Sequence, residues 1–561
     1  DNLAAVFATS LDARNLRSAE IMTGNVSAEY GGKLGAVVNV NTKSGLEMPW
    51  SGSLSLTGGS FSRGEVGAEI GGHWKNLGVF ASAAGQRSQR FLDPPEIQNF
   101  HNFGGSGRLF VKFDWIASQQ DIFRLSLTTN GTNLQVPNRE DQELLGQHQR
   151  QELRDDAQSL AWNHVFSPHT VSDVVAYRRS SSARLLDHGL TGFPFVALQA
   201  RRQRSEGLRA NLSHQRGTHS LKAGVQVLRL PIHEEFLVAA TDPAILADPA
   251  NPASAFPLAS PFQFDGRRTG NETSFFAQDR FTLGGRLTLD VGLRFDHYRI
   301  VVEEDHVSPR VGVAYYVKKT GTVLRASYNR LFQTPPIENL LLSSSPEGAV
   351  FSPIGSLVSR AVGPEEQNAY EVGLQQQLGK YVRLDLAHYI KNIRNFSDKD
   401  QFLNTGVIFP IVIAKGDVRG TEVRMDLAAI RGWSAFLSYA NSKAVATTPL
   451  VGGLFLGESS SELIIPGIEF NADHDQRNSG QFGVTYSHKS GVWFSVSGRH
   501  DSGVPSEFDP AILPLLDPAI REQLDEVRFR IRPRTTLDLA AGVELMSKRR
   551  HPITLQLTVQ N

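Results

Sequence analysis

The stretch Arg286–Asp296, RLTLDVGLRFD, alternates apolar and polar side chains along its length. Its odd positions from 287 to 295 are Leu, Leu, Val, Leu and Phe, whereas Asp290, Arg294 and Asp296 fall on the other side. Successive side chains of a strand point to opposite faces, so a period of two predicts a strand with one apolar and one polar face.

The same alternation recurs along the chain, in TEVRMDLAA (421–429), TTLDLAAGVEL (535–545) and ITLQLTVQ (553–560). Helical periodicity is scarce. Its best example, Asp509–Phe529, contains prolines that would break it into short helical turns within a loop. The sequence therefore predicts an all-β fold.

The expected connections alternate between tight turns and long excursions. WKNLG (74–78), TLGGR (282–286) and QLGKY (377–381) are typical of the tight class. The long class comprises Pro231–Asn271, Gln333–Pro364, Ala444–Asp473 and Ser502–Glu526. Membrane barrels sort their loops in this way, with short turns at one end and long loops at the other.

Strands of roughly 10 to 17 residues on this scheme give about 21 strands, against the even numbers of bacterial barrels. The first is expected at Ser51–Phe61 and the last at Ile553–Asn561. An odd total suggests that one strand is missing, and we expect a gap one strand wide between these two strands.

The two faces of the strands suit a membrane barrel. No window of about 18 apolar residues predicts a spanning helix, but one face of each strand could lie in lipid while the charged face would be costly there. We therefore expect a transmembrane antiparallel β-barrel with a polar lumen, water-filled unless plugged. Six aromatic residues near the short turns predict a girdle at the membrane interface: Trp50, Trp74, Trp115, Tyr315, Tyr316 and Trp433.

Composition excludes several classes of function. Lys and Arg together number 57, as do Asp and Glu, so the basic excess typical of nucleic-acid binding is missing. Without cysteine there are no disulfides or thiolate metal sites.

No catalytic motif stands out either. The 16 histidines show no HExxH spacing, and neither GxSxG nor a phosphate loop occurs. The cluster at 303–306, EEDH, could gather a metal ion, but a solvated strand end explains it better. The cluster at 474–478, HDQRN, is expected to be structural. We expect no enzyme, cofactor or metal site.

At its start the chain carries SAEYGGKLGAVVNVNTKSG (27–45), which resembles the end of the plug domain of TonB-dependent outer-membrane receptors, in the branch that carries a carboxypeptidase-regulatory-like domain. Barrel motifs similar to that family follow in the expected order, among them FFAQDRFTLGGRLTLDVGLRFD (275–296), GPEEQNAYEVGLQQQLG (363–379), GDVRGTEVRMDL (416–427) and HDQRNSGQFGVTYSH (474–488).

The resemblance implies two domains: residues 1–49 as the C-terminal part of the plug, and residues 50–561 as a barrel of the 22-strand type, incomplete at its C-terminus. The earlier plug and the segment gripped by the TonB-type complex would precede Asp1. The implied function is active import of a small ligand, oligosaccharide or peptide across the bacterial outer membrane. A passive porin, a barrel-anchored adhesin and a large soluble β-protein are the alternatives.

The resemblance also marks candidate residues for contact between plug and barrel. Pro364, Glu365, Glu371 and Gly373 match a pattern whose glutamates face the plug, and their even spacing places both glutamates on one face of a strand. Thr23 stands where the family often has an arginine, so substitute cations are expected: Lys33, Lys43 or Arg17. The predicted plug turn comprises Glu29, Tyr30, Gly31, Gly32 and Gly35, with the glycines allowing a sharp turn and close packing.

Overall fold

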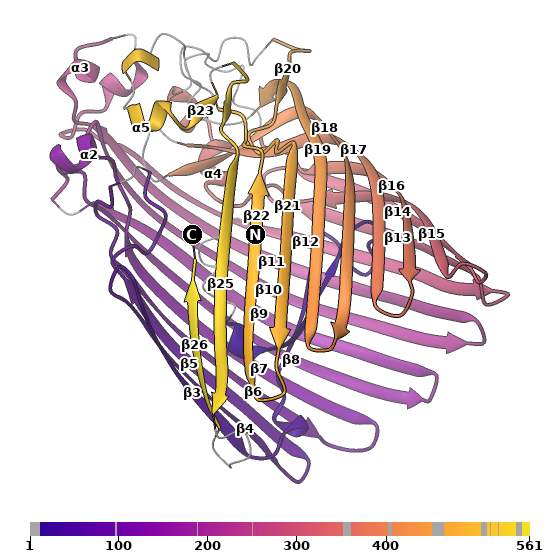
Figure 1. Cartoon of the computed structure of the whole chain (residues 1–561). Coiled ribbons are helices and arrows are strands. Elements are labelled where there is room, and N and C mark those ends of the chain that lie inside the picture. Colours follow the sequence, from indigo (N-terminus) through magenta and orange to yellow (C-terminus); the bar gives the residue numbers. More distant parts are fainter. Residues whose placement is uncertain are drawn as a thin grey trace.

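The computed structural model describes residues 12–95, 98–187, 189–249, 251–351, 361–401, 407–451, 465–506, 513–515, 518–525, 527–545 and 552–560. One large sheet of antiparallel strands forms a barrel (Figure 1). Its first half consists of β3 Ser51–Gly59, β4 Arg63–Trp74, β5 Leu77–Ser88, β6 Gly104–Ile116, β7 Asp121–Gln135, β8 Gln149–Ser167, β9 Thr170–Asp187, β10 Phe195–Arg216, β11 His219–Ala240 and β12 Phe262–Leu283.

The second half continues the same up-and-down order. It consists of β13 Leu287–Arg299, β14 Glu303–Val317, β15 Thr322–Gln333, β16 Glu365–Leu378, β17 Val382–Gln401, β18 Ile408–Ile430, β19 Trp433–Val451, β20 Glu469–Asn471, β21 Asn478–Ser487, β22 Val492–Asp501, β25 Arg534–Leu545 and β26 Ile553–Val559. Two small sheets are separate from the barrel sheet: β1 Leu16–Met22 with β2 Val37–Thr42, and β23 Leu524–Asp525 with β24 Arg530–Ile531.

The described residues contain 22 barrel strands that occupy 21 positions, because β20 and β21 both pair with β19, one beyond the other. The odd number means that β3 and β26 run in the same direction. The strand order brings β26 next to β3 and closes the ring. Because β26 and β3 are hydrogen-bonded neighbours in this closed ring, no room is left for a further strand between them, and the expected gap of one strand width is wrong.

The two faces of β13 point in the predicted directions, with the apolar side chains outward and the charged side chains inward. Val291 and Leu293 are 46% and 53% exposed, as an outward face covered by lipid requires, whereas Arg294 and Asp296 are 1% exposed inside the barrel. An outward apolar surface that extends around the barrel would be an aggregation liability in water. The arrangement therefore fits lipid outside and polar groups inside.

Several strands are longer than the sequence analysis expects. The connection predicted at Pro231–Asn271 is wrong at both ends, because β11 continues to Ala240 and β12 begins at Phe262. Similarly, β19 reaches Val451 within the predicted connection Ala444–Asp473. These extensions carry proline and charged residues, which read as loop, but β11 and β12 are paired there in an unbroken ladder. The pairing of β19 with β18 likewise continues to Val451, across an irregularity between Ile413 and Lys415.

The two ends of the barrel differ as predicted. Tight turns such as 75–76, 284–286 and 379–381 join strands at one end, the short-turn end. The six predicted girdle aromatics are all exposed. The connections of the other end, the long-loop end, carry the short helices α2 Glu140–Leu144, α3 Pro243–Leu246, α4 Leu340–Ser343 and α5 Pro518–Arg521 (Figure 1). None of the described helices is long and apolar enough to cross a membrane.

The apolar core of the molecule lies at the long-loop end rather than in the middle of the barrel. One cluster joins Phe236, Phe262 and Phe409 to Leu342 of α4. A second joins Tyr298 and Phe332 to Leu340 and Leu341 of the same helix. The connection between β15 and β16 is therefore packed against the outer parts of the strands by hydrophobic burial.

Candidate functional site

The N-terminal segment, residues 12–49, contacts inward-facing side chains of many barrel strands. It is built on the hairpin of β1 and β2, whose register pairs Ile21 with Val38 and Met22 with Val37. The strand predicted at AVVNVNTK is β2. Short 3-10 turns, η1 Ala13–Asn15 and η2 Gly45–Glu47, flank the hairpin. These contacts form the candidate site, which we call the segment–wall interface.

The end of β2 is fixed to the first strands of the wall. Lys43 Nζ lies 2.7 Å from Glu69 Oε2 of β4. The hydroxyl of Ser44 donates a hydrogen bond of 2.7 Å to Asp114 Oδ2 of β6, and both residues are buried. Gly45 follows with its Cα against the backbone of Val79, where no side chain would fit. Two polar contacts and a close backbone approach thus anchor this end.

The beginning of the segment is anchored by an arginine that sequence reasoning missed. Arg14 pairs with Asp12 at 2.9 Å and with Glu65 of β4, and its Nε donates to Ser55 Oγ at 3.3 Å. A single arginine beside an aspartate before a short strand gives no sequence signal of its role. Its role follows only from the fold, which places Ser55 of β3 and Glu65 of β4 next to the Arg14 guanidinium.

The predicted turn lies against strands β11 to β13. Glu29 pairs with Lys222, and Ser27 Oγ donates to Gln278 Oε1 at 2.6 Å. The Arg294 guanidinium donates to the Glu29 carbonyl at 3.3 Å and lies against Gly31, so that a side chain at Gly31 would collide with it. Arg294 is in turn paired with Asp296 at 2.8 Å.

The residues of the predicted turn contribute in different ways. The backbone amide of Tyr30 donates to the Ser27 carbonyl at 3.1 Å and closes the turn. Gly32 has a φ of 64°, which favours glycine. Gly35 has neither a positive φ nor a neighbour that a Cβ would touch. The prediction that the backbone requires glycine at this position is therefore wrong.

The wall also holds the backbone of the segment by its carbonyl groups. Arg310 donates to the carbonyl oxygen of Val26 at 3.1 Å and also contacts that of Ser27. Asn329 donates to the Gly24 carbonyl at 3.1 Å, and Gln367 to that of Leu34 at 3.2 Å. Hydrogen bonds to main-chain carbonyls position the segment without requiring particular side chains on it.

The two glutamates of the predicted pattern both face inward on β16, and the intervening Tyr370 and Val372 are 48% and 57% exposed on the other face. Glu371 contacts Gly24 of the segment. Its ion pair, however, is with Arg325 of β15 at 3.3 Å, and Arg325 also binds Asp385 at 2.7 Å. A cation from the wall thus takes the place expected for one from the segment.

The expected cations have other surroundings. Lys43 pairs with Glu69, as described above, and Arg17 pairs with Glu47 inside the segment. Lys33 is near Glu272. Glu365 is 6% exposed, and no ion pair to it forms among the described residues. The hypothesis that these cations partner Glu365 and Glu371 is therefore wrong, because Lys43 and Lys33 lie near other strands of the wall and Arg17 pairs within the segment.

At the long-loop end, Glu234 of β11 holds helix α4. Its two carboxylate oxygens accept the backbone amides of Leu341 at 3.1 Å and Leu342 at 3.0 Å, and its exposure is 2%. About 9–11 residues cross a bilayer, and β11 starts at the short turn, so Glu234 lies beyond the hydrocarbon. Burial raises the pKa of Glu234 to about 7, against the opposing effect of the two amides and Arg201.

The polar clusters weighed from the sequence do not form ligand sets. In 303–306, His306 contacts Glu304 at 3.2 Å and Glu366 at 3.0 Å, while Asp305 binds His297 at 2.8 Å on the other face. In 474–478, Asp475 is 1% exposed and accepts the Ala444 amide at 2.7 Å. That second cluster has the structural role expected of it.

Comparison with known proteins agrees with this architecture. The family model described as "TonB dependent receptor-like, beta-barrel" matches residues 67–561. No curated protein sequence matches the chain. Among solved structures, the copper transporter OprC is similar at 12% identity with a TM-score of 0.71, covering 98% of this chain and 80% of that one.

Two further structures show the same fold. The ferripyoverdine receptor of Pseudomonas aeruginosa is 13% identical with a TM-score of 0.69, covering 97% of this chain and 72% of that one. The ferric-catecholate import receptor Fiu of Escherichia coli K12 is 12% identical with a TM-score of 0.69, covering 98% and 82%. The chain therefore belongs to the TonB-dependent receptor β-barrel family, whose members are proteins of the bacterial outer membrane.

Proposed function

We propose that this protein imports a ligand across the outer membrane by TonB-energised displacement of a plug, of which residues 12–49 are the C-terminal part and residues 50–561 the surrounding barrel. The observation that carries the proposal is the polarity of the segment–wall interface. None of the apolar core clusters among the described residues includes a residue of the segment. The buried apolar side chains of the segment, Val26, Ala28, Leu34 and Val37, belong to none of these clusters, and ion pairs and hydrogen bonds connect the segment to the wall.

Such contacts suit a part that must move. A hydrogen bond contributes only about 0.5–1.5 kcal/mol net, and an ion pair near water about 0.2–1 kcal/mol, because water replaces the lost partner. A pulling force can therefore exchange these contacts one by one for contacts to water. Extraction of an apolar core would expose hydrophobic surface in a single costly step.

The alternatives place different demands on the segment. A passive porin needs an unobstructed lumen, whereas the segment reaches from β4 and β6 across to β13 and β16. An adhesin would need no releasable contacts inside its barrel. We expect no catalytic activity from this chain. Ferric siderophore, cobalamin, saccharide and peptide are the ligand classes to be separated by experiment.

Uptake assays in cells test the proposal. Cells with the full receptor, with and without a functional TonB complex, are given a labelled ferric siderophore, cobalamin, a maltooligosaccharide or an oligopeptide. We expect one probe to accumulate only when both receptor and TonB complex are present. Accumulation that needs the receptor but not the complex would establish the passive porin, and accumulation of no probe in any strain would favour the adhesin.

A further inference from the structure

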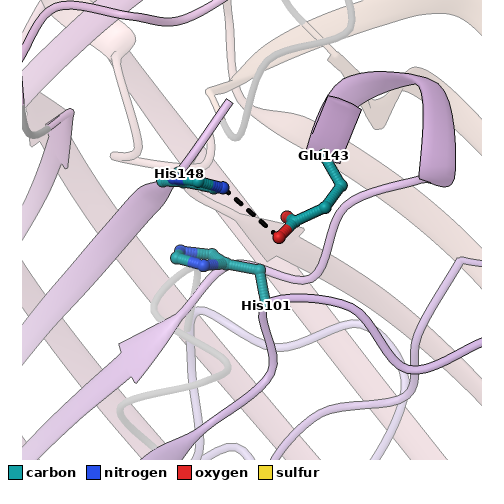
Figure 2. Close-up of side chains that lie close together, drawn as sticks. All are labelled: His101, Glu143 and His148. Carbon is teal, nitrogen blue, oxygen red and sulfur yellow. Dashed lines mark ion pairs between the residues drawn. The ribbon is translucent and has the colours of Figure 1, made fainter. Parts of the chain in front are cut away.

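Two connections at the long-loop end bring together two histidines and a glutamate. His101 lies in the connection between β5 and β6, whereas Glu143 of α2 and His148 lie in that between β7 and β8. Because β6 and β7 are paired along their whole length, the two connections leave the barrel side by side. Figure 2 shows the two imidazole rings stacked face to face, with the Glu143 carboxylate beside them and paired with His148.

The separations suit a small ion. His148 Nε2 lies 3.3 Å from Glu143 Oε1, and ligands about 2.0–2.1 Å from a tetrahedral metal lie roughly 3.3 Å apart. One ligand atom from each of the three residues can be chosen so that all lie within 4.8 Å of one another. The rings of His101 and His148 are stacked with centroids 5.0 Å apart, so one ring must turn to aim its nitrogen at the ion.

Neighbouring groups already hold the outward atoms of two of these side chains. His101 Nε2 lies 2.9 Å from the Gln149 carbonyl oxygen, so this nitrogen carries the hydrogen and Nδ1 keeps its lone pair. Glu143 Oε2 accepts a hydrogen bond of 2.8 Å from Asn138 Nδ2, which leaves Oε1 for the ion. Metal-binding residues are oriented by outer partners of this kind.

The backbone at His101 is held in an unusual conformation. Its φ is 42°, in the left-handed region that side chains other than glycine rarely adopt. The next residue, Asn102, is 3% exposed and fixes the connection by side-chain hydrogen bonds to Leu92 and Asn99. The fold thus maintains a strained backbone at the residue that presents the first imidazole.

We propose that His101, Glu143 and His148 bind a divalent transition-metal ion of the zinc class at the outer rim of the barrel, with a further position open to water. Two imidazoles and one carboxylate suit Zn²⁺, Co²⁺, Ni²⁺ or Cu²⁺, whereas Mg²⁺ and Ca²⁺ require oxygen ligands. The ion links two external connections. The site is independent of the proposed import, since it requires neither plug displacement nor TonB.

A second group at the long-loop end, His233, Glu235 and Asp265, is a weaker arrangement. There a single nitrogen, His233 Nε2, already contacts both carboxylates, at 3.2 Å and 2.9 Å. The carboxylates are 48% and 58% exposed, so the group is explained by an exposed ion pair. It serves as a matched control within the same protein.

The test uses the full receptor purified in detergent micelles, with Zn²⁺ alone in competition with a chromophoric chelator. We expect one ion per chain. His148→Ala and the nearly isosteric Glu143→Gln should each weaken binding more than about 10-fold, and Asn138→Ala about 10- to 100-fold, as loss of an outer partner does. His233→Ala should bind like the wild type. Heat-modifiable electrophoretic mobility confirms that each variant has a folded barrel.

Co²⁺ provides a second readout, because its visible absorption reports the geometry and the ligands directly. We expect intense bands typical of four- or five-coordinate cobalt, lost in Glu143→Gln. Wild-type affinity in both His148→Ala and Glu143→Gln would overturn the proposal. So would loss of binding in His233→Ala, or a wild-type protein that binds neither ion.

Discussion

Gly24 of the N-terminal segment lies directly against the carboxylate of Glu371 on β16: a Cβ at Gly24 would be 2.7 Å from Glu371 Cδ. Gly24 has a φ of 76°, and its carbonyl accepts a hydrogen bond from Asn329. Glu371 is held from the other side by Arg325. One residue of the segment thus contacts two polar residues of the wall, Glu371 and Asn329, and Arg325 fixes the first of them.

The substitution Gly24→Ala should loosen the segment. It combines a strained left-handed backbone, which costs about 1–2 kcal/mol, with displacement of the Glu371 carboxylate. Gly32→Ala is the matched control, because Gly32 has a φ of 64° but no atom within 4 Å of a Cβ. Amide hydrogen exchange of β1 and β2 should be faster in Gly24→Ala than in Gly32→Ala. Equal exchange in the two variants would show that the contact with Glu371 is unimportant.

The pair of Lys43 and Glu69 should couple the segment to the wall by about 0.2–1 kcal/mol, the range of partly exposed ion pairs. A double-mutant cycle with Lys43→Met and Glu69→Gln measures this coupling from the exchange of the β2 amides. Arg17→Met removes a pair that lies wholly within the segment, with side chains 61% and 45% exposed. It should therefore leave the exchange of the β2 amides unchanged. Additive effects of Lys43→Met and Glu69→Gln would contradict the expected coupling.

The buried pair of Arg294 and Asp296 should matter far more for stability. Each side chain is 1% exposed, so Arg294→Met removes the direct ion-pair partner of a carboxylate buried inside the protein. The expected cost is about 3–5 kcal/mol, measured by urea unfolding in detergent micelles. Arg280→Met removes an arginine that is 62% exposed and should cost at most about 1 kcal/mol. Similar losses in both variants would show that the first pair is hydrated.

Docking of α4 should depend on pH through Glu234. The folded-state pKa is raised from 4.5 to about 7, so the folded state binds a proton that the unfolded chain releases. The contribution to stability is therefore complete below pH 4.5 and is lost as the pH rises through about 7. Protection factors of the amides in 340–343 should fall between about pH 5 and pH 8.

Two substitutions test the source of this pH dependence. Glu234→Gln should abolish it, because a neutral amide replaces the titrating group. Glu338→Gln, which changes a carboxylate paired with Arg201 in the same region, should retain it. An unchanged pH profile in Glu234→Gln would show that another group titrates.

Local sequence rules predicted the strands and their faces because a period of two depends only on neighbours along the chain. The even spacing of Glu365 and Glu371 places both on one face of β16, and the apolar Tyr370 and Val372 on the opposite face identify the glutamate face as the inward one. The extension of β11 past Pro231 could not be read in this way, since its polar residues become strand only through pairing with β10 and β12.

Partners across the lumen were beyond the reach of those rules. Lys43 meets Glu69 rather than Glu365 because the hairpin of β1 and β2 points its end at the first strands of the wall. His101 and Glu143 are 42 residues apart and lie in different connections, so no ligand spacing marks them. Such sets become visible only when the register of β6 and β7 is known.

A reversible lock between segment and wall tests the central claim most directly. The Cβ of Ala28 would lie 2.8 Å from a Cβ at Gly292 of β13, about 1 Å less than the usual separation across a disulfide. The chain contains no cysteine that could interfere. The variant Ala28→Cys/Gly292→Cys in the full receptor therefore provides the lock, with each single cysteine variant as control.

The measurement is cellular uptake of the probe that the wild-type receptor accumulates, before and after reduction of the locked variant. We predict that the oxidised double variant does not transport, that reduction restores transport, and that the single variants transport under both conditions. Wild-type uptake by fully oxidised double variant would contradict the account, since the ligand would then pass with residues 12–49 fixed in place.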